Sequence, residues 1–448
     1  LRRHCPVHVG GLRLVLPRLR VAGHEPRQLK LHQHKAKPTY VGWSPEKMIL
    51  NNKKILLGVT GSIAAYKAAD LASKLTQAGA LVDVVLTDAA VKFVTPLTFQ
   101  SVTGRKAYTD LWGDDAHIIH VGLGEAADLL VIAPASADTI AKLSHGLADN
   151  LLTVTALAAR CPLLIAPAMD AGMFEHLATQ ANLKILQERG AIIVGPTEGR
   201  MASGLTGRGR MVEPPELIGH IRLALARGGP LANRKIVVTA GGTQEAIDPV
   251  RFISNHSSGK QGFALVQAAL DRGASVTLIA APTTQPTPVG AARVDVRSAA
   301  QMAEAVLTAC ADADALIMAA AVADFRPETE ADQKIKRSGR EGYSFTLSKT
   351  VDILAAVAEQ KTKTGKPTIT VGFAAETQNL LENAREKLEK KRLSFIVAND
   401  VSASDAGFFV DTNRVTIMDA GGGIEQLPLM SKVEVAEAVC ERIERLLS

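Results

Sequence analysis

The sequence predicts an α/β fold, with a flavodoxin-like or Rossmann-like doubly wound parallel sheet in the N-terminal half and a second Rossmann-like α/β domain in the C-terminal half. Short apolar segments alternate with amphipathic ones along most of the chain, which is typical of strands and helices that follow one another in a parallel sheet. Apolar residues make up 47% of the chain and aromatic residues only 4%, which fits the packing of Ala, Val, Leu and Ile between helices and strands. Consecutive helix stoppers around residues 226–234 interrupt the alternation once, so two such units are expected.

The first unit opens with an apolar strand at residues 55–59, a Gly61-Ser62 turn and an amphipathic helix that ends at Gly79. Further strands are expected at 81–87, 129–133, 163–166 and 192–194. In such a sheet, ligands bind beyond the carboxyl ends of the strands.

The second unit repeats this scheme from residue 236. A strand at 236–239 leads into a Gly241-Gly242 turn and a helix near 262–272. Further strands are expected at 275–280, 315–320, 368–373 and 395–398. We therefore expect domains at residues 48–226 and 235–448, joined by a linker at 227–234.

The excess of basic over acidic residues lies in the first segment of the chain. The net charge is +6, and residues 1–47 hold ten Lys and Arg against two acids, so the rest of the chain has a small negative charge. This distribution argues against a nucleic-acid partner. We expect residues 1–47 to be a non-core extension before a start at Met48; a metal-binding or targeting tail is the alternative.

Membrane and metal functions find little support in the composition. No apolar run reaches the ~18 residues that a membrane span needs. The four cysteines are widely spaced and form no zinc-like pattern, so free thiols in a reducing cytoplasm are expected.

Three loops of the first unit follow strands and carry small or hydroxyl residues. These are the stretches around Gly61-Ser62, around Pro134 and Ser136, and around Met169-Asp170. Backbone N–H groups where a strand gives way to a helix can hold a phosphate. By spacing alone a tight turn with an N-cap explains each loop about as well, and the Gly-x-Gly-x-x-Gly pattern of NAD-linked dehydrogenases is absent. Together, three such loops favour one binding site.

Taken together, five motifs of this half resemble the flavoprotein cysteine decarboxylases over residues 53–213. They are GSIAAYK at 61–67, the stretch from His120 to Leu129, APASAD at 133–138, GLADN at 146–150 and PAMD at 167–170. The resemblance implies a flavodoxin-like fold, trimers with FMN between subunits, and an essential histidine. By its register with the next strand this is His120, with His117 structural. It also implies that Gly61, Ser62, Thr87, Pro134 and Ser136 bind FMN, and that Met169 and Asp170 bind substrate.

The implied reaction is the decarboxylation of phosphopantothenoylcysteine. Oxidation of the substrate's Cα–Cβ–SH unit by FMN creates a thioaldehyde, which accepts the electrons left when carbon dioxide departs; His120 would act as base or positioning donor. The family's Asn is Asp170 here, and the Cys of its substrate flap is Ser203. Ser203 would then have to take the place of a thiol proton donor, although a hydroxyl is a far weaker acid.

The second half carries an unusually polar loop, DPVRFISNHSSGK at 248–260, which by itself could be a hydrated surface loop. With AAAVADF at 319–325, KIKR at 334–337, GFAAET at 372–377 and AND at 398–400, it resembles the phosphopantothenate–cysteine ligases over residues 235–419. Lys387 and Lys391 lie four apart on one predicted helix face and offer two charges to a triphosphate, or else form a solvated stripe. The resemblance implies further roles for Asn255 in stabilising developing charge, Lys334 in catalysis, and Arg251 in binding substrate; Asp324 and Phe373 would contact the nucleotide.

A bifunctional enzyme of coenzyme A biosynthesis is therefore expected. By resemblance, the ligase activates 4′-phosphopantothenate with CTP and Mg²⁺ to an acyl-cytidylate that cysteine displaces, and the decarboxylase yields 4′-phosphopantetheine. No protein ligands for the metal can be named. The resemblance also implies a cytoplasmic homo-oligomer, with trimeric flavin domains and dimeric ligase domains that could form a dodecamer. The alternative is an active ligase whose flavin half is only an oxidative decarboxylase or a non-catalytic flavin-binding module.

Overall fold

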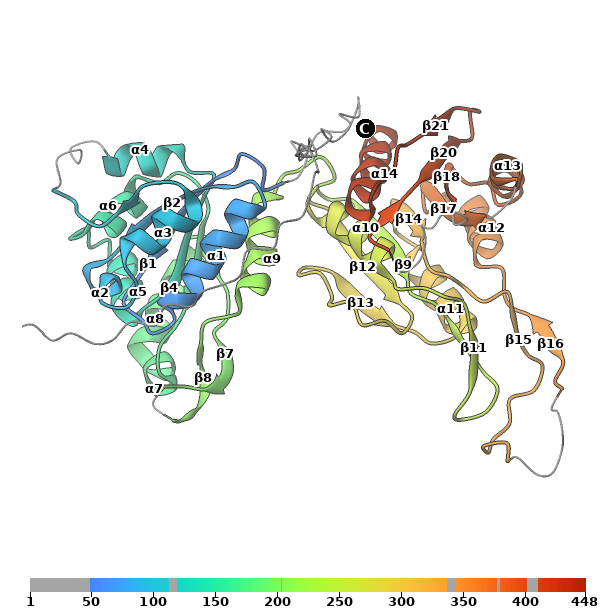
Figure 1. Cartoon of the computed structure of the whole chain (residues 1–448), viewed down its shortest axis with the longest axis horizontal. Coiled ribbons are helices and arrows are strands. Elements are labelled where there is room, and N and C mark those ends of the chain that lie inside the picture. The colour runs from blue at the N-terminus through green and yellow to red at the C-terminus, as the bar shows by residue number, and fades with distance from the viewer. Residues whose placement is uncertain (1–48, 113–118, 203, 337–343, 377–378, 401–409) are drawn as a thin grey trace, which may run out of the picture. The chain divides into compact units, whose positions relative to one another are not determined.

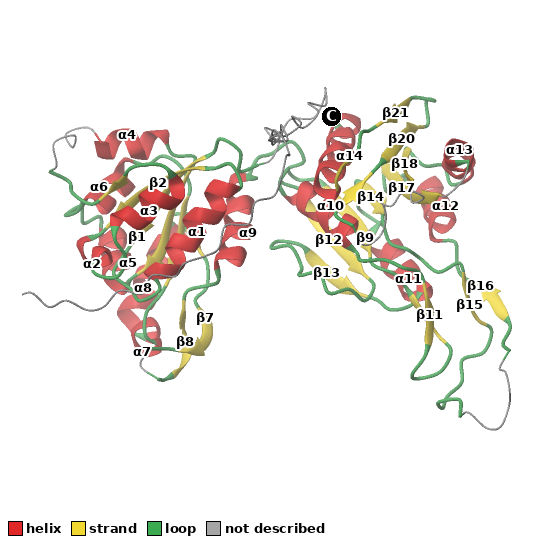
Figure 2. Ribbon diagram, viewed as in Figure 1, coloured by secondary structure: helices red, strands yellow, loops and turns green. Residues whose placement is uncertain are grey.

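The computed structural model describes residues 49–112, 119–202, 204–336, 344–376, 379–400 and 410–448. Figures 1 and 2 show two sheets flanked by helices, one in each half of the chain. The expected α/β class is confirmed in both.

The first sheet is parallel throughout and has the order β3-β2-β1-β4-β5-β6. Its strands are β1 (Lys54–Val59), β2 (Leu81–Leu86), β3 (Ala107–Tyr108), β4 (Leu129–Ala135), β5 (Leu163–Pro167) and β6 (Ile192–Ile193). This is the Rossmann order, and without the two-residue β3 it is the flavodoxin order. All five strands expected here are present, whereas β3 was not predicted because a two-residue strand has no period of its own.

Helices cover both faces of this sheet, as the doubly wound prediction requires (Figure 2). One face packs against α1 (Ala65–Gln77), α3 (Pro96–Thr103) and α9 (Pro214–Leu225). The other packs against α4 (Ile119–Ala126), α5 (Ala137–His145), α6 (Leu151–Ala158) and α8 (Leu177–Glu188). Along β1, Ile55 and Leu57 enter the first core and Leu56 the second. Because β1 is buried on both faces, successive residues are all apolar, which explains the continuous apolar run in the sequence.

Short elements complete the first half. They are α2 (Asp88–Val91), α7 (Ala171–Glu175) and the antiparallel hairpin of β7 (Thr197–Arg200) and β8 (Thr206–Arg210). Residues 226–234, between α9 and the next strand, form only turns.

The second sheet has eight strands in the order β13-β12-β9-β14-β17-β18-β20-β21 among the residues described. They are β9 (Lys235–Ala240), β12 (Ser275–Ala280), β13 (Ala292–Asp295), β14 (Ala315–Met318), β17 (Ile369–Glu376), β18 (Phe395–Asp400), β20 (Val415–Asp419) and β21 (Ile424–Gln426). The six from β13 to β18 are parallel and repeat the Rossmann order, so the predicted second Rossmann-like domain is confirmed. The antiparallel β20 and β21 at one edge were not predicted.

Helices also cover both faces of the second sheet. α10 (Lys260–Leu270) and α14 (Lys432–Leu447) pack on one face, and α11 (Ala299–Ala309), α12 (Ile353–Thr364) and α13 (Leu380–Lys390) on the other. Three small antiparallel pairs lie outside the sheet: β10 (Gln244–Ala246) with β11 (Phe252–Ser254), β15 (Phe325–Pro327) with β16 (Leu347–Lys349), and β19 (Thr412–Asn413) with β22 (Met430–Ser431). In Figure 1 the loop at β11 and the β15–β16 arm project beyond the sheet.

Candidate functional sites

The residues expected to bind flavin or substrate in the first half lie at or after the ends of four neighbouring strands of the first sheet. Gly61 and Ser62 follow β1, Thr87 follows β2, Pro134 and Ser136 lie at the end of β4, and Met169 and Asp170 follow β5. The strand order reverses between β1 and β4, which is where such sheets bind ligands. The structure therefore brings these residues to one edge, as expected.

Thr60, which directly precedes Gly61, joins two of these loops. Its fully buried hydroxyl donates to the Pro134 carbonyl oxygen at 2.7 Å and accepts from the Ser136 N–H at 2.9 Å. A Cβ added to Gly61 would lie 2.5 Å from the Ala89 Cβ, so this position admits only glycine without a shift. The loops are thus fixed relative to one another before any ligand binds.

Several hydroxyls of this site already serve as caps. Thr87 caps α2, and Ser136 caps α5 by accepting from the Thr139 N–H at 3.3 Å. Asp138, in the first turn of α5, pairs with Lys142. Capping and ligand binding are compatible, because a hydroxyl has two lone pairs and one proton to offer.

The hairpin β7–β8 lies against the Met169–Asp170 loop. The Met169 N–H donates to the Gly209 carbonyl oxygen at 3.0 Å, and a Cβ on Gly209 would lie only 2.2 Å from the Met169 carbonyl oxygen. Asp170 caps α7 by accepting from the Gly172 N–H at 3.2 Å. Its carboxylate therefore already holds a backbone donor. Ser203 lies between the two hairpin strands, outside the described residues.

Lys67, quoted in the first motif without a role, anchors the base of this hairpin. Its buried ammonium donates to the Met211 carbonyl oxygen at 3.0 Å and to the Glu213 carboxylate at 2.7 Å. A lysine inside an apolar helix face could have indicated such a buried contact, since Lys is rarely buried without a partner.

His120 lies in the first turn of α4, half-buried. Its Nδ1 atom is buried, and no hydrogen-bond partner for it is present among the described residues. Because a helix that precedes a parallel strand runs opposite to it, this turn lies toward the carboxyl edge of the sheet. Buried polar atoms are rarely left unpaired in native proteins, so His120 has an open position for a ligand or a bound water. His117 lies outside the described residues.

In the second half, most of the expected residues line one cavity of about 750 Å³ at the carboxyl ends of β14, β17 and β18. The expected residues found there are Asn255, Asp324, Phe373, Lys387 and Lys391. The strand order reverses at β9 and β14, next to this cavity.

Arg251 and Lys334 lie apart from this group. Arg251 lines a second cavity of about 790 Å³, which shares Lys349, Thr350 and Val351 with the first. Lys334 is exposed and lines neither cavity. Among the described residues, Arg251 and Lys334 therefore do not line the cavity that the other five expected ligase residues share.

Polar contacts hold the loop after β14 against the cavity. The Asn255 side chain donates to the Val322 carbonyl oxygen at 3.0 Å, and the Thr243 hydroxyl accepts from the Ala323 N–H at 2.9 Å. This pairing leaves the second N–H and the side-chain oxygen of Asn255 available to a ligand, with the amide already oriented.

The two lysines of α13 differ in their surroundings. Lys387 is half-buried, while Lys391 caps the helix end and forms an ion pair with Asp352. Lys390 between them is exposed, as expected. The C-terminal end of the helix therefore presents Lys387 and Lys391 to the cavity and Lys390 to solvent.

A second pair of cations in this cavity was not predicted as such. Lys260 begins α10 and Lys432 begins α14, and both line the cavity. Burial, and secondly the charge of Lys260, lower the pKa of the Lys432 ammonium. Lys260 ends the polar motif and could have been found there; Lys432 has no sequence signal, because it comes into the site only through the fold.

Three side-chain amides form a chain that ends in the same cavity. Gln261 donates to the Lys432 carbonyl oxygen at 3.0 Å, Asn413 donates to Gln261 at 3.0 Å, and Asn399 donates to Asn413 at 3.3 Å. A carbonyl can only accept, so it fixes the orientation of all three amides. The buried oxygen of Asn399 is left without a partner among the described residues.

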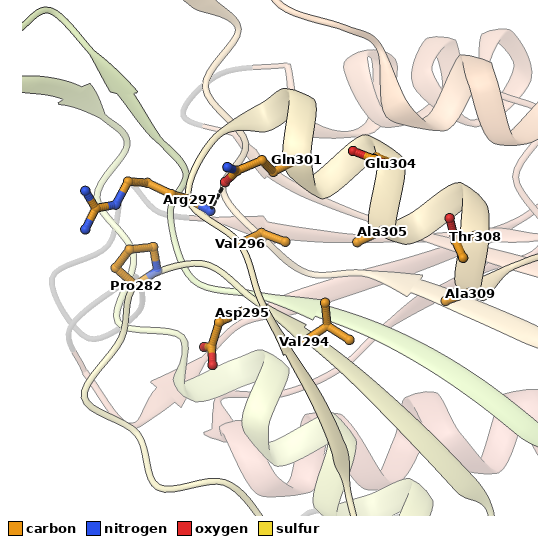
Figure 3. A pocket seen from close by; sticks show the side chains of 10 residues that line it. All are labelled: Pro282, Val294, Asp295, Val296, Arg297, Gln301, Glu304, Ala305, Thr308 and Ala309. Carbon is orange, nitrogen blue, oxygen red and sulfur yellow. Dashed lines mark hydrogen bonds between the residues drawn. The ribbon is translucent and has the colours of Figure 1, made fainter.

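Other features of the described residues give little indication of a binding or catalytic site. A cavity of about 720 Å³ lies between β13 and α11 at the sheet edge (Figure 3), and none of the expected site residues lines it. No group of three His, Cys, Asp or Glu that could hold a metal is found in the part of the chain described. Cys310 and Cys440 are free and buried, and burial raises the pKa of each to about 12. Within the same residues, no helix has the length and apolar character needed to cross a bilayer.

Comparison with known proteins matches both halves of the chain. The flavoprotein family model matches residues 44–225, and the model of the C-terminal domain of DNA/pantothenate metabolism flavoproteins matches residues 231–447. The chain is 45% identical to the coenzyme A biosynthesis bifunctional protein CoaBC of Bacillus subtilis, over 89% of this chain and 98% of that protein. It is 42% identical to the protein of the same name from Escherichia coli K12, over 88% and 98%.

Solved structures resemble the halves separately. The C-terminal domain of a coenzyme A biosynthesis bifunctional protein CoaBC is 39% identical over 49% of this chain and 98% of its own, with a TM-score of 0.42. A mutant PPC decarboxylase, complexed with pantothenoylaminoethenethiol, is 37% identical over 39% and 98%, with a TM-score of 0.36.

Proposed function

The chain belongs to the family of coenzyme A biosynthesis bifunctional proteins, and we propose from this premise how its two halves divide the work. It is a bifunctional flavoprotein enzyme of coenzyme A biosynthesis. The second half ligates 4′-phosphopantothenate with cysteine, and the first half decarboxylates the product to 4′-phosphopantetheine. The observation that carries this division is the alignment with 98% of the Bacillus subtilis relative, which includes both halves. It also makes an inactive flavin module the less favoured alternative.

The proposed domains are residues 48–226 and 235–448, with 227–234 as linker. The turns between α9 and β9 support this division, as do the bounds of the two family models.

The residues at the carboxyl edge of the first sheet fit an FMN group. The loops after β1 and β4 present backbone N–H groups and hydroxyls at the starts of α1 and α5, which suits a phosphate. Bound there, FMN would supply two-electron oxidation and re-reduction of the substrate. Gly61, Ser62, Thr87, Pro134 and Ser136 would hold it, while Met169 and Asp170 would contact the substrate from the next loop.

His120 is proposed as the base or positioning donor of the decarboxylase. Its unpaired Nδ1 atom supports this role, since a ring nitrogen with no partner among the described residues can take or hold a substrate proton. Ser203 is proposed to relay a proton from water in the later, reductive half of the cycle, in place of a thiol.

In the ligase, the cavity at β14, β17 and β18 is proposed to hold CTP. Lys387 and Lys391 would contact its phosphates, and Asp324 and Phe373 its nucleoside. Asn255 would stabilise charge that develops at the acyl phosphate. Mg²⁺ would enter bound to the triphosphate, which supplies its own oxygen ligands.

Arg251 and Lys334 are proposed to act on 4′-phosphopantothenate from the second cavity and the arm beside it. We further propose that the enzyme works in the cytoplasm as a homo-oligomer, with trimeric flavin domains and dimeric ligase domains that together could form a dodecamer. Small molecules are its only proposed substrates.

One incubation tests the proposal as a whole. The purified full chain receives 4′-phosphopantothenate, cysteine, CTP and Mg²⁺, and products are resolved by mass. We expect phosphopantothenoylcysteine, pyrophosphate, carbon dioxide and phosphopantetheine. Replacing CTP by ATP tests the nucleotide preference, and Asn255→Asp should stop ligation while decarboxylation of added phosphopantothenoylcysteine continues. No ligation product with either nucleotide would refute the ligase assignment.

A further inference from the structure

The turn between β10 and β11 contains a buried carboxylate. Asp248 is 2% exposed, although its neighbours Val250 and Phe252 are 58% and 51% exposed. A buried carboxylate is costly unless hydrogen bonds or a cation satisfy it. The groups around Asp248 therefore reveal what the residue does.

The two oxygens of Asp248 make different contacts. Oδ1 accepts from the Val250 N–H at 2.8 Å and the Arg251 N–H at 2.9 Å, and these bonds close the turn. Oδ2 accepts from the Ile335 N–H at 3.2 Å and lies 3.5 Å from the Arg251 Nη1 atom. One oxygen thus shapes the turn, and the other reaches a segment far along the chain.

Arg251 completes the grip on that segment. Its Nη2 atom donates to the Ile335 carbonyl oxygen at 2.9 Å. Both polar groups of Ile335, N–H and C=O, are therefore held by two residues of one turn, and the Ala331 N–H donates to the Ile247 carbonyl oxygen at 3.0 Å beside them. Ile335 directly follows Lys334. We call Asp248, Arg251 and Ile335 the clamp.

The charge of the clamp persists at neutral pH. Burial alone would raise the pKa of the Asp248 carboxyl, but the three backbone N–H donors and the guanidinium around it lower that pKa below its ordinary value. A lowered carboxyl pKa means that the contribution to stability is present at neutral pH and is lost as pH falls through the lowered value.

We propose that Asp248 is a positioning residue of the ligase: with Arg251 it fixes the backbone beside Lys334, so that this lysine acts from a held rather than a free segment. The proposal rests on the proposed function, because it requires that Lys334 take part in ligation. It also assigns Arg251 a second role, since the guanidinium expected to bind substrate is engaged with the chain itself. Ordering the segment beforehand removes an entropy cost from each turnover.

Asp248→Asn tests the clamp selectively. With its one oxygen in the Oδ1 position, asparagine still accepts the two hydrogen bonds that close the turn. Its NH₂ group then faces the Ile335 N–H and the guanidinium, so only the contacts to Ile335 and Arg251 that Oδ2 makes are lost. We expect kcat for ligation to fall about tenfold or more, because that ratio corresponds to the free energy of one charge-assisted hydrogen bond. KM for CTP should change little. Asp312→Asn is the matched control, because Asp312 is an exposed partner of Lys235 that lines neither cavity.

A double-mutant cycle separates positioning from general damage. In a protein that already carries Lys334→Gln, Asp248→Asn should lower kcat for ligation little further, because the lysine that Asp248 positions is absent. Equal losses in both backgrounds would overturn the proposal. Amide exchange of a peptide spanning residues 329–336 should also accelerate in Asp248→Asn and not in Asp312→Asn; unchanged protection would overturn the clamp itself.

A substitution of Arg251 provides a second, independent test of the clamp. Arg251→Lys keeps the charge but cannot hold Oδ2 and the Ile335 carbonyl oxygen with a planar fork. We expect kcat to fall; a rise in KM for 4′-phosphopantothenate alone, at constant kcat, would mean that Arg251 only binds substrate. If Lys334→Gln ligates normally, the role of Lys334 is wrong, whereas absence of ligation in the unmodified protein would refute the proposed function instead.

Discussion

At the scale of single residues, four described side chains have a buried polar atom without a hydrogen-bond partner, and two of them, His120 and Asn399, concern the proposed sites directly. His120 is the proposed base of the first half, and Asn399 lines the proposed nucleotide cavity of the second. An unpaired buried acceptor costs about 1–3 kcal/mol in the free protein, so a ligand that satisfies it gains more than from an exposed contact. These atoms therefore mark where binding and stability are linked.

His120→Asn should remove decarboxylation and spare ligation. Asparagine retains a polar group of similar reach but cannot take a proton, so we expect carbon dioxide release to fall by about a hundredfold or more. The measurement is paired: carbon dioxide from added phosphopantothenoylcysteine, and pyrophosphate from CTP. Equal loss of both activities in a protein that keeps its flavin absorbance would contradict the proposed division.

Asn399→Leu should weaken nucleotide binding. Amino and hydroxyl groups of CTP are donors, and the Asn399 oxygen is an acceptor whose direction the amide chain fixes. We expect about fivefold lower affinity, the equivalent of one hydrogen bond, and a smaller rise in melting temperature on adding CTP. An unchanged shift with CTP would show that the oxygen faces no part of the nucleotide.

The sequence indicated the candidate residues that lie in motifs, but not those that the fold alone brings into a cavity. Pro134 and Ser136 lie at the end of an expected strand, and Asn255 lies in the polar motif at residues 248–260. Lys432 and Asn413 follow edge elements with no motif, and only long-range packing brings them into the cavity. Lys334 lies in a motif as well, but the motif did not indicate that the fold places this residue outside both cavities.

At the scale of elements, the long central strands were predictable and the short antiparallel ones were not. β9 and β12 are apolar on both faces, which leaves a continuous signal in the sequence. The β7–β8 hairpin contains Gly199, Gly207 and Gly209, and such residues do not indicate a strand. What selects this hairpin is contact with the Met169 loop, a tertiary effect.

The hairpin carries the next prediction, although Ser203 itself lies outside the described residues. Since a hydroxyl is a poorer acid than a thiol, the reductive half of the decarboxylase cycle should be faster in Ser203→Cys than in the native protein. Anaerobic single turnover, followed by flavin absorbance and product mass together, measures this step. A persistent product two mass units lighter than phosphopantetheine would instead make this half an oxidative decarboxylase.

A buried ion pair joins the turn that follows α10 to α14. Arg272 Nη1 lies 2.7 Å from Glu437 Oε2, with side chains 11% and 5% exposed, and Arg272 also donates to the Glu437 carbonyl oxygen at 3.2 Å. Burial raises the pKa of Glu437 even though Arg272 opposes the rise. The pair is thus held against a large desolvation cost.

Removing one partner should cost more than removing both. Arg272→Leu leaves the Glu437 carboxylate buried and unpaired, so we expect the free energy of unfolding of the second half to fall by about 3–5 kcal/mol. Arg272→Leu with Glu437→Leu should recover much of that loss. Denaturant unfolding of the ligase transition measures it, with flavin release as the internal control. A double variant less stable than either single one would contradict this account.

At the scale of the whole molecule, both halves use one topology to make two different sites. The six parallel strands of each sheet have the Rossmann order, and most of the expected ligand residues lie near the point where that order reverses. The sequence could predict this because each half starts with strand, glycine turn and helix. The sequence could not predict the antiparallel β20 and β21 or the projecting arms. Their position depends on the sheet edge at which the chain adds strands after the parallel strands are formed.

Deleting residues 1–47 should leave both activities unchanged. Every proposed site residue follows Met48, and the alignment that covers 98% of the Bacillus subtilis relative uses only 89% of this chain. The deletion also removes a segment with ten Lys and Arg against two acids, which turns the net charge from positive to slightly negative, so the truncated protein should elute later from an anion exchanger at neutral pH. Flavin absorbance per chain, ligation rate and carbon dioxide release are compared with those of the full chain under the same salt. Loss of bound flavin on truncation would mean that this segment supports the first domain, and loss of ligation alone would mean that it contributes to the second.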